Sequence, residues 1–95
     1  MIYELTIIAP ESATKVDIEH LTKIIKRHSM SIEKFEDDGV KRLAYPINGH
    51  DRGRYLFWQL DMPTGEPQKL SAELNITDEV LRHLLVKADT RYGGR

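Results

Sequence analysis

The chain has 95 residues, of which 40% are hydrophobic and 31% charged, and its formal net charge is −1, which suits one domain with a single core. It contains no cysteine; this excludes disulfides, a thiol nucleophile and cysteine-ligated zinc, and it suits a reducing cytoplasm. No apolar run approaches the roughly 20 residues that a membrane span needs, and no signal peptide is expected.

A strand and a helix are predicted first. Residues 2–9 (IYELTIIA) predict a strand because apolar residues alternate along them, and Tyr3, Leu5, Ile7 and Ala9 share one face. Thr14 is a predicted helix N-cap, and Asp17 stands three residues later, where its carboxylate can reach the free amides. The following helical stripe consists of Ile18, Leu21, Ile24, Ile25 and His28.

Residues 30–36 and 40–47 are predicted to be strand. The odd spacing of Ile32 and Phe35 breaks strict alternation and indicates a bulge nearby. The Asp37-Asp38-Gly39 segment between the two stretches is either a tight turn or a kink in one long strand. Pro46 requires a strand edge or end, because proline cannot donate to the ladder.

Residues 48–53 are expected to be a polar connection with a turn at Asn48-Gly49. Residues 54–62 (RYLFWQLDM) predict a strand whose core face holds Leu56, Trp58, Leu60 and Met62.

A helix over residues 66–74 and a strand over residues 80–87 complete the chain. Pro67 is tolerable only in the first helical turn. Both faces of the last strand are half apolar, so its register stays open. Residues 88–95 are expected to be a mobile tail.

The order strand–helix–strand–strand–helix–strand predicts an α+β, ferredoxin-like fold formed by residues 1–87 as a single domain. In this fold a four-stranded antiparallel sheet carries both helices on one face. The other face stays bare, and alternation places Tyr55 and Phe57 on it.

The segment GVKRLAYPI at residues 39–47 resembles the signature of the bacterial small-subunit ribosomal protein six (S6) family. Four further features fall at spacings similar to the family's: Tyr3-Glu4, the aromatic third strand ending at Met62-Pro63, the helix with Leu70 and Glu73-Leu74, and residues 80–87. The resemblance covers residues 1–87. It implies a cytoplasmic, ribosome-bound protein that is not an enzyme and that needs no cofactor.

The resemblance also implies two partners: the central domain of small-subunit ribosomal RNA (rRNA) and ribosomal protein eighteen (S18). A net charge of −1 is unusual for a freestanding nucleic-acid binder, because phosphate contacts dominate affinity. A basic protein partner would supply the missing positive charge.

Two sets of candidate residues follow. The predicted RNA-binding residues are Lys41, Arg42, Arg82, Lys87 and Arg91. The predicted partner face consists of Ile2, Ile8, Tyr55 and Phe57, with Leu84 and Val86 as further members. Aromatic sheet faces can also stack bases, but the motif of the common RNA-recognition fold is absent here, so a protein partner is the favoured occupant.

A small-ligand sensor or an acylphosphatase-type enzyme is the alternative, because many functions share this fold. The enzyme needs an arginine in the loop after the first strand. This loop is Pro10-Glu11-Ser12-Ala13, and the first arginine of the chain is Arg27. The four histidines show no metal-ligand spacing, so no metal site is predicted.

Overall fold

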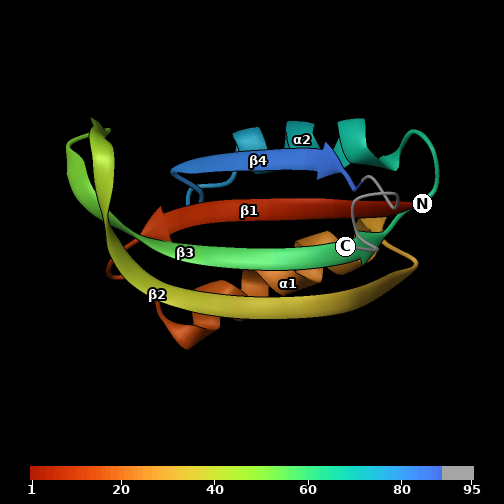
Figure 1. Ribbon diagram of the computed structural model, residues 1–95, viewed down its shortest axis with the longest axis horizontal. Coiled ribbons are helices and arrows are strands. Elements are labelled where there is room, and N and C mark those ends of the chain that lie inside the picture. Colours follow the sequence, from red (N-terminus) through yellow and green to blue (C-terminus); the bar gives the residue numbers. More distant parts are fainter. Residues whose placement is uncertain (89–95) are drawn as a thin grey trace.

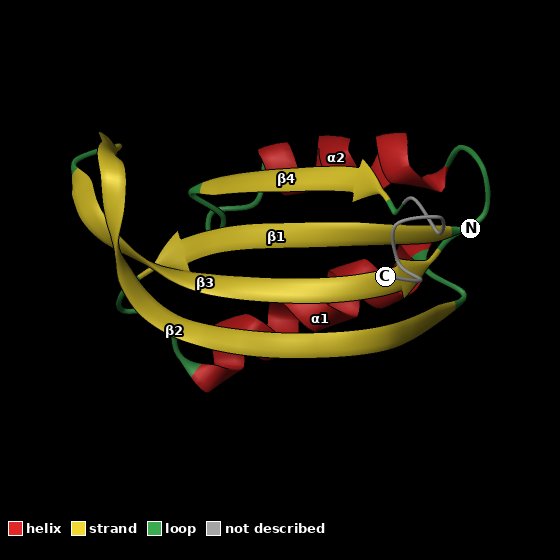
Figure 2. Ribbon diagram, in the orientation of Figure 1, coloured by secondary structure: helices red, strands yellow, loops and turns green. Residues whose placement is uncertain are grey.

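The computed structural model describes residues 1–88. The elements are β1 (Ile2–Pro10), α1 (Lys15–His28), β2 (Ser31–Ile47), β3 (His50–Asp61), α2 (Glu66–Asn75) and β4 (Arg82–Lys87). The strands form one antiparallel sheet in the order β2-β3-β1-β4. Both helices cover the same face of this sheet (Figures 1 and 2). The predicted ferredoxin-like arrangement is therefore confirmed. Neither helix is long and apolar enough to cross a membrane.

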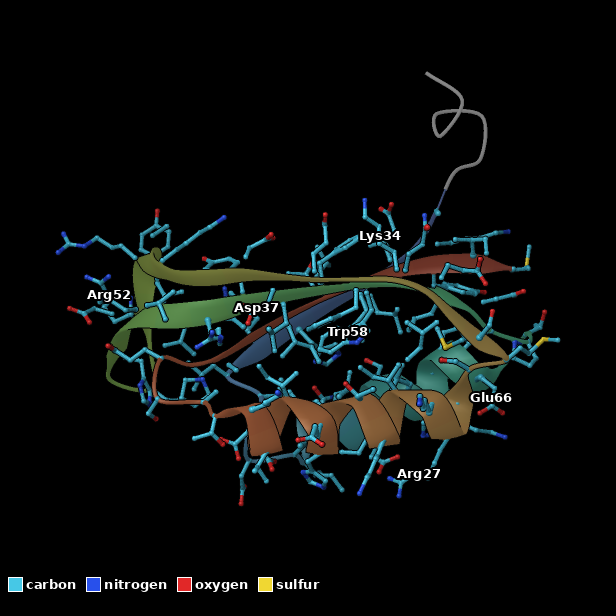
Figure 3. The ribbon with its side chains drawn as sticks, turned by 90° about the horizontal axis from the view of Figure 1, so that it is seen from below. Arg27, Lys34, Asp37, Arg52, Trp58 and Glu66 are labelled. Atoms are coloured by element: carbon cyan, nitrogen blue, oxygen red, sulfur yellow. The ribbon has the colours of Figure 1, made fainter. Side chains whose placement is uncertain are left out.

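The core lies between the sheet and the two helices, as Trp58 illustrates in Figure 3. The Trp58 side chain is completely buried, and the Phe35 ring packs beside it with centroids 5.0 Å apart. Strand alternation supplies one wall of this core and the helical stripes supply the other. The most completely buried residues are Leu5, Ile7, Ala9, Leu21, Ile24, Ile25, Leu56, Trp58, Leu60, Met62, Leu70 and Leu74.

Local chemistry fixes where each helix begins. The Asp17 amide donates to Thr14 Oγ1 over 3.3 Å and the Thr14 amide donates to Asp17 Oδ2 over 2.9 Å, which is the reciprocal capping box predicted for α1. Pro67 lies in the first turn of α2, where a missing amide hydrogen costs no helical bond. Gly65, with φ of 94°, turns the chain into that helix.

Strand β2 runs unbroken for 17 residues, so the segment at Asp37 is a kink and not a turn. The pairing of β2 with β3 shifts between Asp37 and Gly39, and the Gly39 amide donates to Asp37 Oδ1 over 3.0 Å. A second shift between Ile32 and Lys34 confirms the predicted bulge. Pro46 is the penultimate residue of this outer strand, as its chemistry requires.

The predicted start of β3 at residue 54 was wrong, because the strand begins at His50. Asn48 and Gly49 both have positive φ angles, 49° and 82°, and they close the hairpin in two residues. The polar residues 50–53 are therefore drawn into the ladder opposite β2 instead of forming a connection.

The predicted start of β4 at residue 80 was also wrong, because the strand begins at Arg82. The Val80 amide donates to the Thr77 carbonyl over 3.1 Å, which places Val80 in the turn after α2. Pairing with β1 settles the register that the sequence left open. Leu84 lies opposite Thr6 and Leu85 lies opposite the buried Leu5, so Leu85 faces the helices and Leu84 faces away.

An ionic network ties the end of α1 to α2. His28, whose side chain is 14% exposed, lies with Nδ1 3.0 Å from Glu66 Oε1 and with Nε2 2.8 Å from Glu73 Oε1. Arg27 pairs with Glu73, and Lys69 pairs with Glu66. Hydrogen bonds from His28 lower the pKa of both carboxyl groups, and Lys69 and Arg27 add to this effect.

This network predicts a loss of stability in acid. A carboxyl group with a lowered pKa in the folded state stabilises the fold fully above its ordinary value of 4.5, and this contribution is lost as the pH falls through the lowered value. His28→Ala is expected to lower Tm near neutral pH by roughly 5 °C and to flatten the fall of Tm in acid. Calorimetry of the wild type and of His28→Ala, from neutral pH to below the ordinary carboxyl pKa of 4.5, measures both changes in Tm. Curves of Tm against pH that run parallel for the two proteins would contradict the assignment of this acid sensitivity to the contacts of His28.

Candidate protein and RNA interface

One face of the sheet has no helix on it, and this open face carries most of the predicted partner residues. Figure 3 shows both helices on one side of the sheet and Lys34 pointing away from them on the other. Phe57 lies opposite Thr6, which in turn lies opposite Leu84. Register partners share a face, so these three side chains form a row across β3, β1 and β4.

The neighbouring row extends the apolar surface. Tyr55 lies opposite Ile8, and Ile8 lies opposite Arg82. We call Ile8, Tyr55, Phe57, Leu84 and Val86 the open-face patch. Leu84 is 61% exposed and Val86 is 43% exposed, and the other three members are half-buried. A contiguous apolar surface of this kind is typical of a protein-interaction site.

Ile2 shares the open face by alternation and lies diagonally beside Val86, because Glu4 is the register partner of Val86. The register partner of Ile2 on β3 is Asp61, and Glu4 and Thr6 separate Ile2 from Ile8 along the strand. Ile2 therefore lies at the far end of the same face.

Charged residues border the open-face patch. The Lys41 ammonium lies 5.4 Å from the centroid of the Tyr55 ring, within the range of a cation–π contact. Arg82 borders the patch on β4, because it stands beside Ile8. On β2, Lys34 and Glu36 form an ion pair with 3.6 Å between Nζ and Oε2. Positive charge is thus available on two sides of the patch.

The five predicted RNA-binding residues do not form one cluster. Lys41 and Arg82 lie on the open face, whereas Lys87 pairs with Tyr3 at a helix-facing position. Arg42 lies opposite Arg52 in the β2–β3 hairpin, one position from Lys41 and on the other face of the strand. Arg91 lies outside the described residues.

Asp37 and Arg54 form an ion pair that the sequence analysis missed. Arg54 Nε lies 3.2 and 3.1 Å from the two carboxylate oxygens of Asp37. This two-point hydrogen bond lowers the pKa of the Asp37 carboxyl group, and the hydrogen bond from the Gly39 amide lowers it further. Partial desolvation acts in the opposite direction and raises it. The partners are 17 residues apart on neighbouring strands, and no spacing along the chain signals the contact.

Within residues 1–88, no group of histidine, aspartate and glutamate side chains is arranged to hold a metal ion. His83 is an example of a histidine with a structural contact. Its Nε2 lies 2.8 Å from Ser71 Oγ, and burial lowers its pKa.

A sequence model described as ribosomal protein S6 matches residues 2–87. The chain belongs to the ribosomal protein S6 family. The predicted family is therefore confirmed, and with it the function as a structural component of the small ribosomal subunit. The sensor and the acylphosphatase-type enzyme receive no support.

Individual S6 proteins resemble the chain over most of its length. The small ribosomal subunit protein bS6 of Thermus thermophilus is 32% identical over 94 residues, which cover 95% of this chain and 93% of the relative. The bS6 protein of Rickettsia prowazekii is 30% identical over 92 residues, covering 93% of this chain and 76% of the relative. The crystal structure of 30S ribosomal protein S6 from Thermotoga maritima superimposes with a TM-score of 0.81 at 23% identity, covering 99% and 97% of the two chains. This last likeness bears on the fold alone.

Proposed function

We propose that this S6 protein binds S18 through the open face of its sheet and that the pair binds the central domain of small-subunit rRNA. In this role the protein is a cytoplasmic, non-catalytic scaffold. The observation that carries the proposal is the open-face patch, an apolar surface on three adjacent strands that no helix covers.

The composition of the patch favours a protein over RNA as its occupant. Ile8, Leu84 and Val86 are aliphatic, and aliphatic side chains lack the flat aromatic surface on which bases stack. Tyr55 and Phe57 lie on a single strand beside them. A large apolar side chain from a protein partner would gain by leaving water at such a surface.

The charge distribution supports a shared RNA contact. The whole chain has a net charge of −1, so we expect it to make few phosphate contacts of its own. Lys41 and Arg82 border the open-face patch, where they can contact RNA beside a bound partner. Most of the phosphate neutralisation then comes from the basic partner.

The direct test is the mass of the complex in solution. The protein and S18 from the same organism are mixed at micromolar concentration and separated by size-exclusion chromatography with light scattering. The proposal predicts one complex with one copy of each chain. Two separate peaks at the masses of the free chains, with both proteins folded, would contradict it.

A further inference from the structure

Two arginines face each other at the outer end of the β2–β3 hairpin. Strand β1 ends opposite Gly53, so residues beyond this point pair only within the hairpin. Figure 3 places Arg52 at that end of the molecule, and Figure 1 shows the hairpin bending away from the rest of the sheet there. Arg42 is the register partner of Arg52, so both side chains leave the same face with Cβ atoms about 5 Å apart.

This arrangement leaves two positive charges unbalanced. Both arginines are exposed, and within residues 1–88 neither takes part in an ion pair, whereas nearby Arg54 is held by Asp37. Asp51 is adjacent to Arg52 in sequence and points to the opposite face of the strand. Like charges directly opposite each other on neighbouring strands are destabilising. An anion between the two side chains would convert this repulsion into attraction.

We propose that Arg42 and Arg52 together clamp one phosphate group of the RNA backbone. Guanidinium groups match phosphate oxygens with paired, charge-assisted hydrogen bonds, so two facing guanidiniums can hold a single phosphate from both sides. The proposal rests on the proposed RNA-binding function and adds Arg52, which the sequence analysis did not single out. The two facing guanidinium groups call for an anion, and the proposed function makes that anion a phosphate of the RNA backbone.

The neighbouring residues suit this role. The pairing of β2 and β3 is irregular between Arg42 and Ile47, and Tyr45 in this stretch is 80% exposed. Leu43, directly after Arg42, is only 7% exposed, so it anchors the backbone that carries Arg42. An anchored backbone reduces the entropy that the clamp loses on binding. The exposed Tyr45 ring offers a surface for a base or ribose next to the phosphate.

The test is a titration of a central-domain rRNA fragment with the S18 complex of each variant, over a range of salt concentrations. Arg42→Gln and Arg52→Gln are each expected to weaken binding roughly tenfold. Because both side chains hold one phosphate, the double variant should lose little more than either single variant. In the double variant, the slope of log K against log salt should fall by about 0.9 in magnitude, the value for one phosphate. Lys23→Gln removes the same charge from α1 and should bind like the wild type.

Two outcomes would overturn the clamp: wild-type affinity and slope for Arg52→Gln, or losses that multiply in the double variant with a slope change of about two phosphates. If the wild-type complex binds no rRNA, the proposed function fails, and a second measurement still decides on the clamp. Phosphate buffer should raise the Tm of the free wild-type protein more than that of the double variant at matched ionic strength. Equal shifts would refute the anion site.

Discussion

Phe57→Asp is expected to weaken S18 binding strongly while the protein stays folded. Phe57 lies in the middle row of the open-face patch, opposite Thr6 and next to Tyr55 along β3. A carboxylate at this position would have to lose its hydration without a partner charge. The expected loss of affinity is at least about 30-fold, the scale of an interface hot spot. Isothermal titration of S18 into the wild type and the variant measures it.

Val16→Asp is the matched control, because it also replaces an apolar side chain with aspartate. Val16 lies on α1 and is 71% exposed, so the new charge stays in water on the other side of the molecule. Its S18 affinity should equal that of the wild type, and circular dichroism should show both variants folded. A folded Phe57→Asp protein with wild-type affinity would place the S18 contact elsewhere.

Trp58→Ala is expected to destabilise the fold by about 3–5 kcal/mol. Trp58 is adjacent to Phe57 in sequence but points to the opposite side of the sheet, where its side chain is completely buried against Phe35. Removing it leaves a cavity that the surrounding core fills only in part. A loss of this size is a large fraction of the total stability of a small domain. Urea denaturation followed by circular dichroism measures it.

Leu84→Ala tests the other side of the same sheet. Leu84 is 61% exposed, so its truncation should change the unfolding free energy by no more than about 0.5 kcal/mol. The same truncation should weaken S18 binding, because Leu84 belongs to the open-face patch. A Trp58→Ala cost below about 1 kcal/mol, or a Leu84→Ala cost as large as that of Trp58→Ala, would contradict the assignment of the two faces.

Alternation and helical spacing were sufficient to predict the fold and nearly all of the core. The alternating strand residues Leu56, Trp58 and Leu60 are completely buried, as their pattern required. The capping box at Thr14 was also visible in the sequence, because both of its partners lie within one helical turn. These features depend on residues that are close together in the chain.

The errors arose where contacts with a neighbouring strand override local pattern. His50 to Gly53 look like a polar connection, yet the two-residue turn at Asn48-Gly49 places them in the ladder. The register of β4 depends on its pairing with β1, which its own half-apolar faces do not encode. Sequence patterns therefore identified β4 but neither its starting residue nor its register.

The bulges explain why two features of the candidate site were missed. A regular hairpin closed by Asn48-Gly49 would place Tyr45 opposite Arg52, but the irregular pairing of β2 brings Arg42 there instead. The ion pair of Asp37 and Arg54 likewise lies beside the shift at Gly39. From Arg42 to Ile47 strand β2 advances five positions, whereas β3 advances only two between their partners Arg52 and His50. Extra residues in one strand change every partner beyond them, and the sequence does not reveal where they fall.

The central claim is that this S6 protein and S18 bind rRNA as a unit, and one titration tests it most directly. A central-domain rRNA fragment is titrated with the protein alone, with S18 alone and with both, at low and at high salt. The proposed function predicts tight, salt-sensitive binding only when both proteins are present. Equal rRNA affinity of S18 with and without this protein, with both chains folded, would contradict the claim.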